Sequence, residues 1–145
     1  MSRFRQRASD ELQAGDSFTV SRRFTIEDIQ LFTRISLDYQ PAFFDACFAE
    51  ATVFKAIVSH ELLTASLVTE IGRKIGWVSD NITCHFKQPA YTGDMITCLW
   101  VIKTLDNQGR AKAQITMTNE AGMTVMDAEA CGGVSYMAGR KYHLR

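Results

Sequence analysis

Residues 58–71 decide the fold, and they read Val58-Ser59-His60-Glu61-Leu62-Leu63-Thr64-Ala65-Ser66-Leu67-Val68-Thr69-Glu70-Ile71. Ser59 is expected to cap a helix, because its hydroxyl can accept hydrogen bonds from the free N–H groups of the first turn. Beyond Glu61, whose charge suits the positive end of the helix dipole, apolar or small residues cover most of the circumference. A helix with so narrow a polar face is usually buried. It is too short to cross a bilayer, since about ten residues precede Glu70 and roughly 20 are needed. We therefore expect a central helix inside a soluble domain, ending within residues 72–76.

The segments on either side of this helix predict strands and shorter helices. Asp28 follows Thr25 by three residues, a capping-box pattern that starts a helix, and Pro41 forces loop geometry after Leu37. Apolar and polar residues alternate over residues 82–86 and 113–117, as they do in half-buried strands, whereas residues 95–104 are mostly apolar. The expected elements are a strand over 18–24, a helix over 25–37, a helical turn over 45–51, and strands over 82–86, 95–104, 113–117 and 123–134. Strands that follow a long buried helix favour an α+β domain in which one sheet curls around one helix.

Length and charge limit the classes of protein that the chain can represent. With 145 residues it has the size of one domain and can bury a real core. Sixteen basic and sixteen acidic residues cancel, which argues against nucleic acid or an anionic membrane as the main partner. We also expect a polar arm over residues 1–15 and a mobile basic tail over residues 139–145.

The cysteines and histidines do not form the patterns of a disulfide framework or a metal site. Cys47, Cys84, Cys98 and Cys131 are widely spaced and include no Cys-x-x-Cys pair, so we expect reduced thiols. The three histidines lack ligand spacing, and no glycine-rich phosphate loop follows a strand, so neither a metal nor a nucleotide cofactor is expected. The basic N-terminus has no apolar stretch behind it, which predicts no signal peptide and a cytoplasmic location.

Three separated motifs resemble those of one family. Residues 37–49 read Leu-Asp-Tyr-Gln-Pro-Ala-Phe-Phe-Asp-Ala-Cys-Phe-Ala, similar to a Gly-Asp-x-Asn-Pro-x-His-x-Asp-x-x-Phe-Ala signature. Residues 59–67 resemble Ala-His-Gly-Met-Leu-x-Ala-Ser-Leu, and residues 86–94 resemble a Phe-x-x-Pro-Val-x-x-Gly-Asp turn. The family is that of the MaoC-like dehydratases, which include the (R)-specific enoyl-CoA hydratases. The resemblance covers residues 15 to about 134 of a single domain over residues 1–145. It implies the hotdog fold, a homodimer whose sheets join edge to edge, and an acyl-CoA or acyl-carrier-protein thioester as substrate.

The resemblance also implies where the chemistry lies. In the family an aspartate and a histidine five residues later hold a water that adds across the double bond of an enoyl thioester. Asp38 matches the aspartate, but Phe43 stands at the histidine and Leu37 at the preceding glycine. A backbone N–H at the start of the central helix polarises the thioester carbonyl, and Glu61 stands there in place of glycine. A phenyl ring cannot move a proton, and losing one acid–base partner typically costs about 10²–10⁴ in rate.

Asp38 and Ser66 are therefore the expected catalytic residues, with Ser66 supporting the site by hydrogen bonding, while Glu61, His60 and Phe43 are expected to contact the substrate. A histidine in the first turn of a helix is by default structural, but His60 is also the nearest imidazole to the presumed site. The Glu61 carboxylate would either crowd the substrate or replace the missing base. Two alternatives stay open: hydrolysis of the thioester by Asp38 or Glu61, and an acyl-thioester-binding domain without catalysis.

Overall fold

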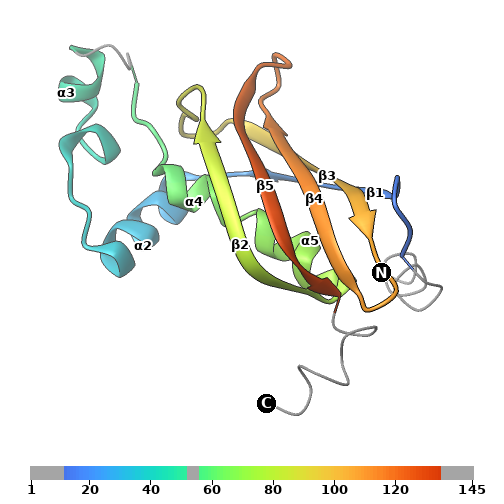
Figure 1. Cartoon of the computed structure of the whole chain (residues 1–145). Coiled ribbons are helices and arrows are strands. Elements are labelled where there is room, and N and C mark those ends of the chain that lie inside the picture. Colours follow the sequence, from blue (N-terminus) through green and yellow to red (C-terminus); the bar gives the residue numbers. More distant parts are fainter. Residues whose placement is uncertain (1–11, 52–55, 135–145) are drawn as a thin grey trace.

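The described part of the chain is built from one antiparallel sheet and several short helices (Figure 1). The computed structural model describes residues 12–51 and 56–134. The strands are β1 (Ser17–Arg23), β2 (Trp77–Phe86), β3 (Met95–Leu105), β4 (Arg110–Thr118) and β5 (Thr124–Val134), and they form the order β1-β3-β4-β5-β2. The helices are α2 (Ile26–Ser36), α3 (Ala46–Glu50), α4 (Glu61–Ala65) and α5 (Val68–Ile75), with a 3-10 turn, η1 (Pro41–Phe43). The arm expected over residues 1–15 lies mostly outside the described residues, and the tail expected over 139–145 lies wholly outside them.

One face of the sheet carries the core and packs on α5. Side chains of β3 are buried at every second position, as the two-residue period of a strand requires. These side chains are Ile96, Cys98, Trp100 and Ile102. Helix α5 adds Ile71 and Ile75, both 0% exposed, and it contacts the two edge strands β1 and β2. A helix can touch both edges of one sheet only if the sheet curls around it, so the expected α+β hotdog arrangement is confirmed.

The central helix begins later than the sequence predicts. The chain is still extended at Ser59, whose backbone N–H donates to the Ala90 carbonyl at 2.7 Å. Helix α4 therefore starts only at Glu61, with His60 at its N-cap and no side-chain cap, and the prediction of Ser59 as the cap is wrong. The far end matches expectation, since α5 stops at Gly76 in the left-handed conformation with a φ of 76°.

A turn at residues 66–67 divides the central helix into α4 and α5. Backbone bonds there join residues three apart, as from the Thr69 N–H to the Ser66 carbonyl at 3.0 Å. The face toward the sheet is buried, but on the outer face Leu62 is 65% exposed and Ser66 and Thr69 are also exposed. The expectation that the helix is buried around most of its circumference is therefore wrong for the single chain, because the sheet covers one side only.

Helices α2 and α3 and the turn η1 lie to one side of the sheet (Figure 1). Helix α2 starts with the predicted capping box, since the Thr25 hydroxyl accepts from the Asp28 N–H at 3.2 Å and the Asp28 carboxylate accepts from the Thr25 N–H at 2.9 Å. Asp45 caps α3 by accepting from the Phe48 N–H at 3.0 Å. The loop that carries Asp38 lies between these two capped helices.

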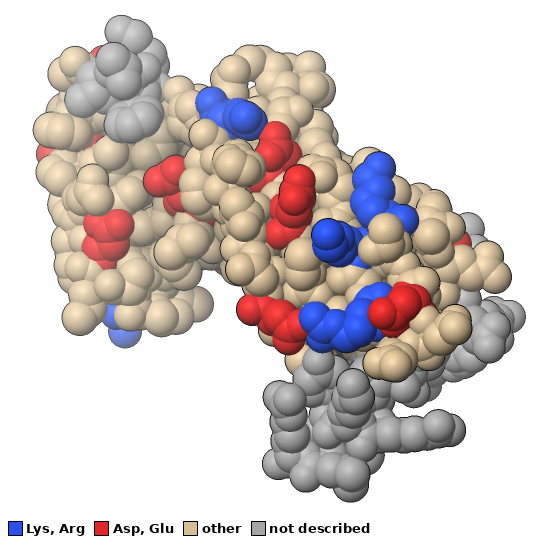
Figure 2. All heavy atoms as spheres, in the orientation of Figure 1, with Lys and Arg blue, Asp and Glu red and all other residues tan. Residues whose placement is uncertain are grey.

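The surface carries charges of both signs. Figure 2 shows basic and acidic side chains interspersed over the strands on one face. Lys87 pairs with Asp127 at 3.8 Å, and Arg110 pairs with Asp80. This mixture agrees with the cancelling charges of the sequence. Within the described ranges, no helix has the length and apolar character that a bilayer crossing would need.

The prediction of reduced cysteines is confirmed, because all four are free thiols. Cys98 is fully buried in the core. Burial, and to a smaller extent the negative charge of Glu70, raises the pKa of the Cys98 thiol to about 12. This thiol is therefore uncharged at neutral pH and acts as a small apolar core residue.

Gly132 and Gly72 form a matched pair that tests the packing of this fold. A Cβ at Gly132 would lie 2.1 Å from the Val78 carbonyl oxygen, beside the register shift in β2. We expect Gly132→Ala to lower the free energy of unfolding by at least about 1–3 kcal/mol, the usual cost of overpacking. A Cβ at Gly72 would make ordinary contacts at 3.7 Å, so Gly72→Ala should stabilise α5 by up to about 1 kcal/mol through helix propensity. Urea denaturation of both variants measures this, and equal stabilities would contradict the packing described.

Candidate functional site

His60 is the centre of a buried polar cluster. It is 3% exposed, and its Nε2 lies 3.3 Å from the Asp38 carbonyl oxygen and 3.2 Å from Thr33 Oγ1. The Thr33 hydroxyl donates its own hydrogen to the Ile29 carbonyl at 2.8 Å. Thr33 Oγ1 and the Asp38 carbonyl oxygen can therefore both accept a hydrogen bond from Nε2. His60 therefore carries its hydrogen on Nε2, and Nδ1 is a buried acceptor with no partner among the described residues.

Two phenyl rings enclose the imidazole of His60. Phe43 stacks on it with ring centroids 3.7 Å apart and 20° between the planes, and Phe32 meets it edge-on at 5.0 Å. The phenyl ring of Phe43 thus covers the imidazole of a residue at the start of the central helix. These contacts bring α2, η1 and the residue before α4 into one cluster.

Asp38 follows a residue in a strained backbone conformation. Leu37 ends α2 with a φ of 61°, the only positive φ at a residue other than glycine in the described ranges. The Asp38 N–H donates to Ser36 Oγ at 3.2 Å, and its carbonyl accepts from His60. The half-buried carboxylate of Asp38 has no hydrogen bond or ion pair with the described residues, so it is free to act on a bound molecule.

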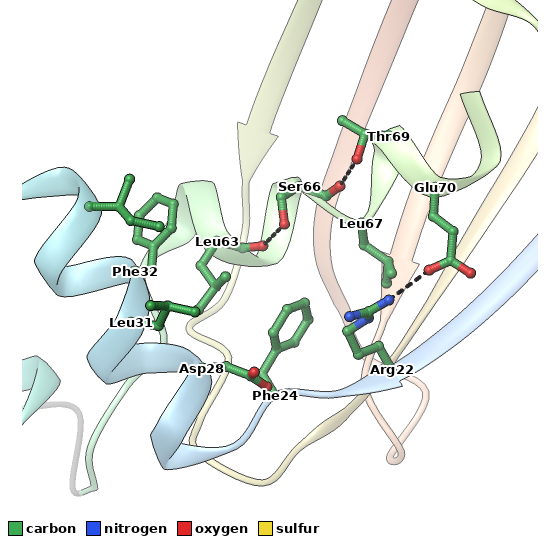
Figure 3. A pocket seen from close by; sticks show the side chains of 11 residues that line it. Arg22, Phe24, Asp28, Leu31, Phe32, Leu63, Ser66, Leu67, Thr69 and Glu70 are labelled. Atoms are coloured by element: carbon green, nitrogen blue, oxygen red, sulfur yellow. Dashed lines mark hydrogen bonds and ion pairs between the residues drawn. The ribbon is translucent and has the colours of Figure 1, made fainter. Parts of the chain in front are cut away.

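A groove with a volume of about 230 Å³ lies between α2 and the outer face of the central helix (Figure 3). Its apolar lining consists of Phe24, Leu31, Phe32, Ile35, Leu63 and Leu67. Ser66 also lines it and donates to the Leu63 carbonyl at 2.6 Å, leaving its oxygen able to accept. Phe32 belongs both to the groove and to the aromatic cluster around His60, so the two sites adjoin.

An ion-pair cluster lies at one end of this groove. Figure 3 shows the ion pair of Arg22 with Glu70. Arg22 Nη2 lies 2.9 Å from Glu70 Oε1, and Lys74 Nζ lies 3.3 Å from the other carboxylate oxygen. The hydrogen bond from Arg22 lowers the pKa of the Glu70 carboxyl, and Lys74 adds to the shift, although burial opposes it. Glu70 therefore stays ionised at neutral pH and is a structural charge rather than a proton carrier.

The structure gathers some of the sequence-predicted site residues and separates others. Asp38, His60 and Phe43 are in one cluster, whereas Ser66 lies on the groove and donates to Leu63 rather than to Asp38. Glu61 is exposed at the first turn of α4. Phe32, which contacts both His60 and the groove, was not predictable as part of the site, because its helical spacing in α2 is that of an ordinary core residue.

The curled sheet wrapped around the central helix defines the hotdog fold. Residues 7–125 match the MaoC-like domain family, and the chain belongs to this family.

Relatives and solved structures agree with this assignment. An (R)-specific enoyl-CoA hydratase of Rhodospirillum rubrum is 27% identical over 125 residues, which cover 83% of this chain and 87% of that protein. A mitochondrial 3-hydroxyacyl-[acyl-carrier-protein] dehydratase of Arabidopsis thaliana is 32% identical over 87 residues, covering 59% of this chain and 52% of that protein. The structure of an (R)-hydratase from A. caviae involved in PHA biosynthesis superposes with a TM-score of 0.81 at 25% identity, over 86% of this chain and 98% of that one. The relatives are thus hydratases and dehydratases of acyl thioesters.

Leu37→Gly tests the backbone strain beside Asp38. A left-handed conformation costs an L-residue roughly 1–2 kcal/mol, and the Leu37 side chain is 72% exposed, so little packing is lost with it. We expect Leu37→Gly to raise the free energy of unfolding by up to about 1 kcal/mol, since the added freedom of the unfolded chain offsets part of the relief. Leu31→Gly, inside α2 and 57% exposed, should instead destabilise by about 1 kcal/mol. Urea denaturation compares them, and a loss of similar size in both would exclude strain at Leu37.

Proposed function

We propose that the chain is a hydro-lyase that adds water across the double bond of an enoyl thioester, as an (R)-specific enoyl-CoA hydratase does. The observation that carries this proposal is the Asp38 side chain, half-buried and unpaired with any described residue, in a loop whose backbone is bonded to His60. The cluster around His60 shares Phe32 with the apolar groove. The relatives, an enoyl-CoA hydratase and a 3-hydroxyacyl-[acyl-carrier-protein] dehydratase, support the same class of reaction. Acyl-CoA or acyl-carrier-protein thioesters are the proposed substrates, and a cytoplasmic location is proposed with them.

The proposed reaction uses Asp38 as the only side-chain base. Asp38 accepts a proton from water while the water oxygen bonds to the β-carbon, and the π electrons of the double bond move toward the thioester oxygen. The first N–H of α4, at Glu61, has no acceptor inside its helix and is assigned to that oxygen. The α-carbon then takes the proton back from Asp38, which restores the carboxylate. Ser66 is proposed to hold the substrate on the groove side.

Phe43 and His60 set the expected speed of this reaction. Phe43 cannot share the proton transfer, so catalysis is expected to be about 10²–10⁴ slower than with a second acid–base group. His60 does not fill that role in this geometry, because its Nε2–H is directed at the Asp38 carbonyl and at Thr33, its Nδ1 is buried away from solvent, and Phe43 covers one face of the ring. Both residues are therefore proposed to shape the site rather than to move protons.

The test is incubation with crotonyl-CoA, following both loss of the double bond and release of free thiol. We expect slow hydration without thiol release, abolished in Asp38→Asn, which keeps the size of the side chain but removes the base. Phe43→His should raise the rate about tenfold or more, since it adds a second acid–base group beside the substrate water.

Other patterns across the variants identify the alternatives. Thiol release that survives Asp38→Asn and disappears in Glu61→Gln would replace the hydratase with a thioesterase, in which the exposed Glu61 carboxylate acts. Absence of turnover in every variant, with retained binding of acyl-CoA, would indicate a binding domain without catalysis.

A homodimer formed through β2 is proposed as the working unit. Strand β2 is an edge of the sheet, and its Ile82 and Phe86 are 44% and 40% exposed. Unpaired edges of long apolar strands are usually covered in native proteins. The exposed Leu62 on the outer face of α4 is a further apolar surface that a second copy would cover.

Light scattering at micromolar concentration tests this dimer. The wild-type chain should have twice the mass of one chain, and Ile82→Asp should shift it toward monomer, because a charge on the edge strand opposes edge-to-edge pairing. Met123→Asp is the matched control, since Met123 is 43% exposed but lies in the turn before β5. A monomeric wild-type chain would exclude the proposal.

A further inference from the structure

The two halves of the proposed site meet at a single residue, His60. The next residue, Glu61, carries the backbone N–H assigned to the thioester oxygen. The imidazole of His60 reaches back to the Asp38 carbonyl at 3.3 Å. The side chain of His60 thus contacts the residue proposed as the base, Asp38, and the backbone of His60 leads directly into the Glu61 amide.

The loop that carries Asp38 has few other supports. Residues 37–40 form no regular secondary structure, and Leu37 is held in the left-handed conformation. Within the described ranges, the other hydrogen bond of Asp38 runs to Ser36, in the same segment of chain. The bond from His60 is therefore the contact that ties the Asp38 backbone to the central helix.

The orientation of the His60 ring is held on several sides. Phe43 stacks flat against it at 3.7 Å, Phe32 meets it edge-on at 5.0 Å, and Thr33 Oγ1 shares the Nε2 hydrogen at 3.2 Å. A ring that is 3% exposed and enclosed in this way cannot turn without displacing its neighbours. The donor on Nε2 consequently stays directed at Asp38.

We propose that His60 is a positioning residue, whose Nε2–H holds the Asp38 carbonyl and so fixes the Asp38 carboxylate relative to the Glu61 amide. Phe43 has a related part, because its ring keeps the imidazole in that orientation. The inference rests on the proposed hydratase function, since Asp38 is the base of that reaction. It requires no contact between His60 and the substrate.

Three variants distinguish the effect of the His60 N–H donor from the effect of the size of its ring. His60→Phe keeps a ring between Phe43 and Phe32 but removes the donor, whereas His60→Gln keeps an N–H donor at similar reach. Thr33→Val removes the second acceptor and leaves the bond to Asp38 possible. With crotonyl-CoA, kcat should fall about tenfold to a hundredfold in His60→Phe, with KM within about twofold, because misplacing a reacting group by about 1 Å has an effect of that size. His60→Gln and Thr33→Val should stay within about threefold of the wild-type kcat.

A second measurement does not depend on turnover. Nitrogen NMR of the wild-type protein should show His60 in the Nε2–H tautomer, and the Asp38 backbone signals should move in His60→Phe but little in Thr33→Val. Thermal denaturation of each variant shows that it is folded.

The outcomes separate this inference from the proposed function. Equal losses of kcat in His60→Phe and His60→Gln, wild-type kcat in His60→Phe, or an Nδ1–H tautomer would each overturn the positioning role. If the wild-type protein does not hydrate crotonyl-CoA, the proposed function fails. The His60 tautomer and the Asp38 NMR signals then still test whether His60 Nε2–H bonds to the Asp38 carbonyl.

Discussion

The packing of α5 into the curled sheet is the constraint on which the rest of the structure depends. Ile71 and Ile75 have no exposed surface, and α5 touches both edge strands. Burying a side chain of this size contributes roughly 1.5–3 kcal/mol relative to leaving it exposed. Because only the turn at residues 66–67 joins α5 to α4, anchoring α5 also sets where α4 and its first residue lie.

The same packing leaves the outer face of the central helix for function. The sheet covers one side, while Leu62, Ser66 and Thr69 face away from it. Helix α2 lies along this outer face and forms the groove with it (Figure 3). The candidate site thus lies where a loop and a helix start meet beside the core, as is usual for chemistry carried on a rigid scaffold.

The phenyl ring of Phe43 shapes the cluster around His60. It presents an apolar surface that stacks on the imidazole with ring centroids 3.7 Å apart. The imidazole of His60 is directed at the backbone of Asp38 rather than at the groove. The placement of Asp38 depends on contacts with its backbone, from its own N–H to Ser36 and from His60 to its carbonyl.

The sequence by itself determined the features that arise within one turn or one strand. The capping box at Thr25, the stop at Gly76 and the alternation of β4 were predictable, because each depends on neighbours a few residues away. The motif around Asp38 likewise predicted the family and the loop. Tertiary structure alone decided that Ser59 pairs with Ala90 instead of capping a helix, and that His60 bonds to a carbonyl 22 residues away. No local periodicity encodes such contacts, since they exist only after the sheet has curled around α5 and brought distant segments together.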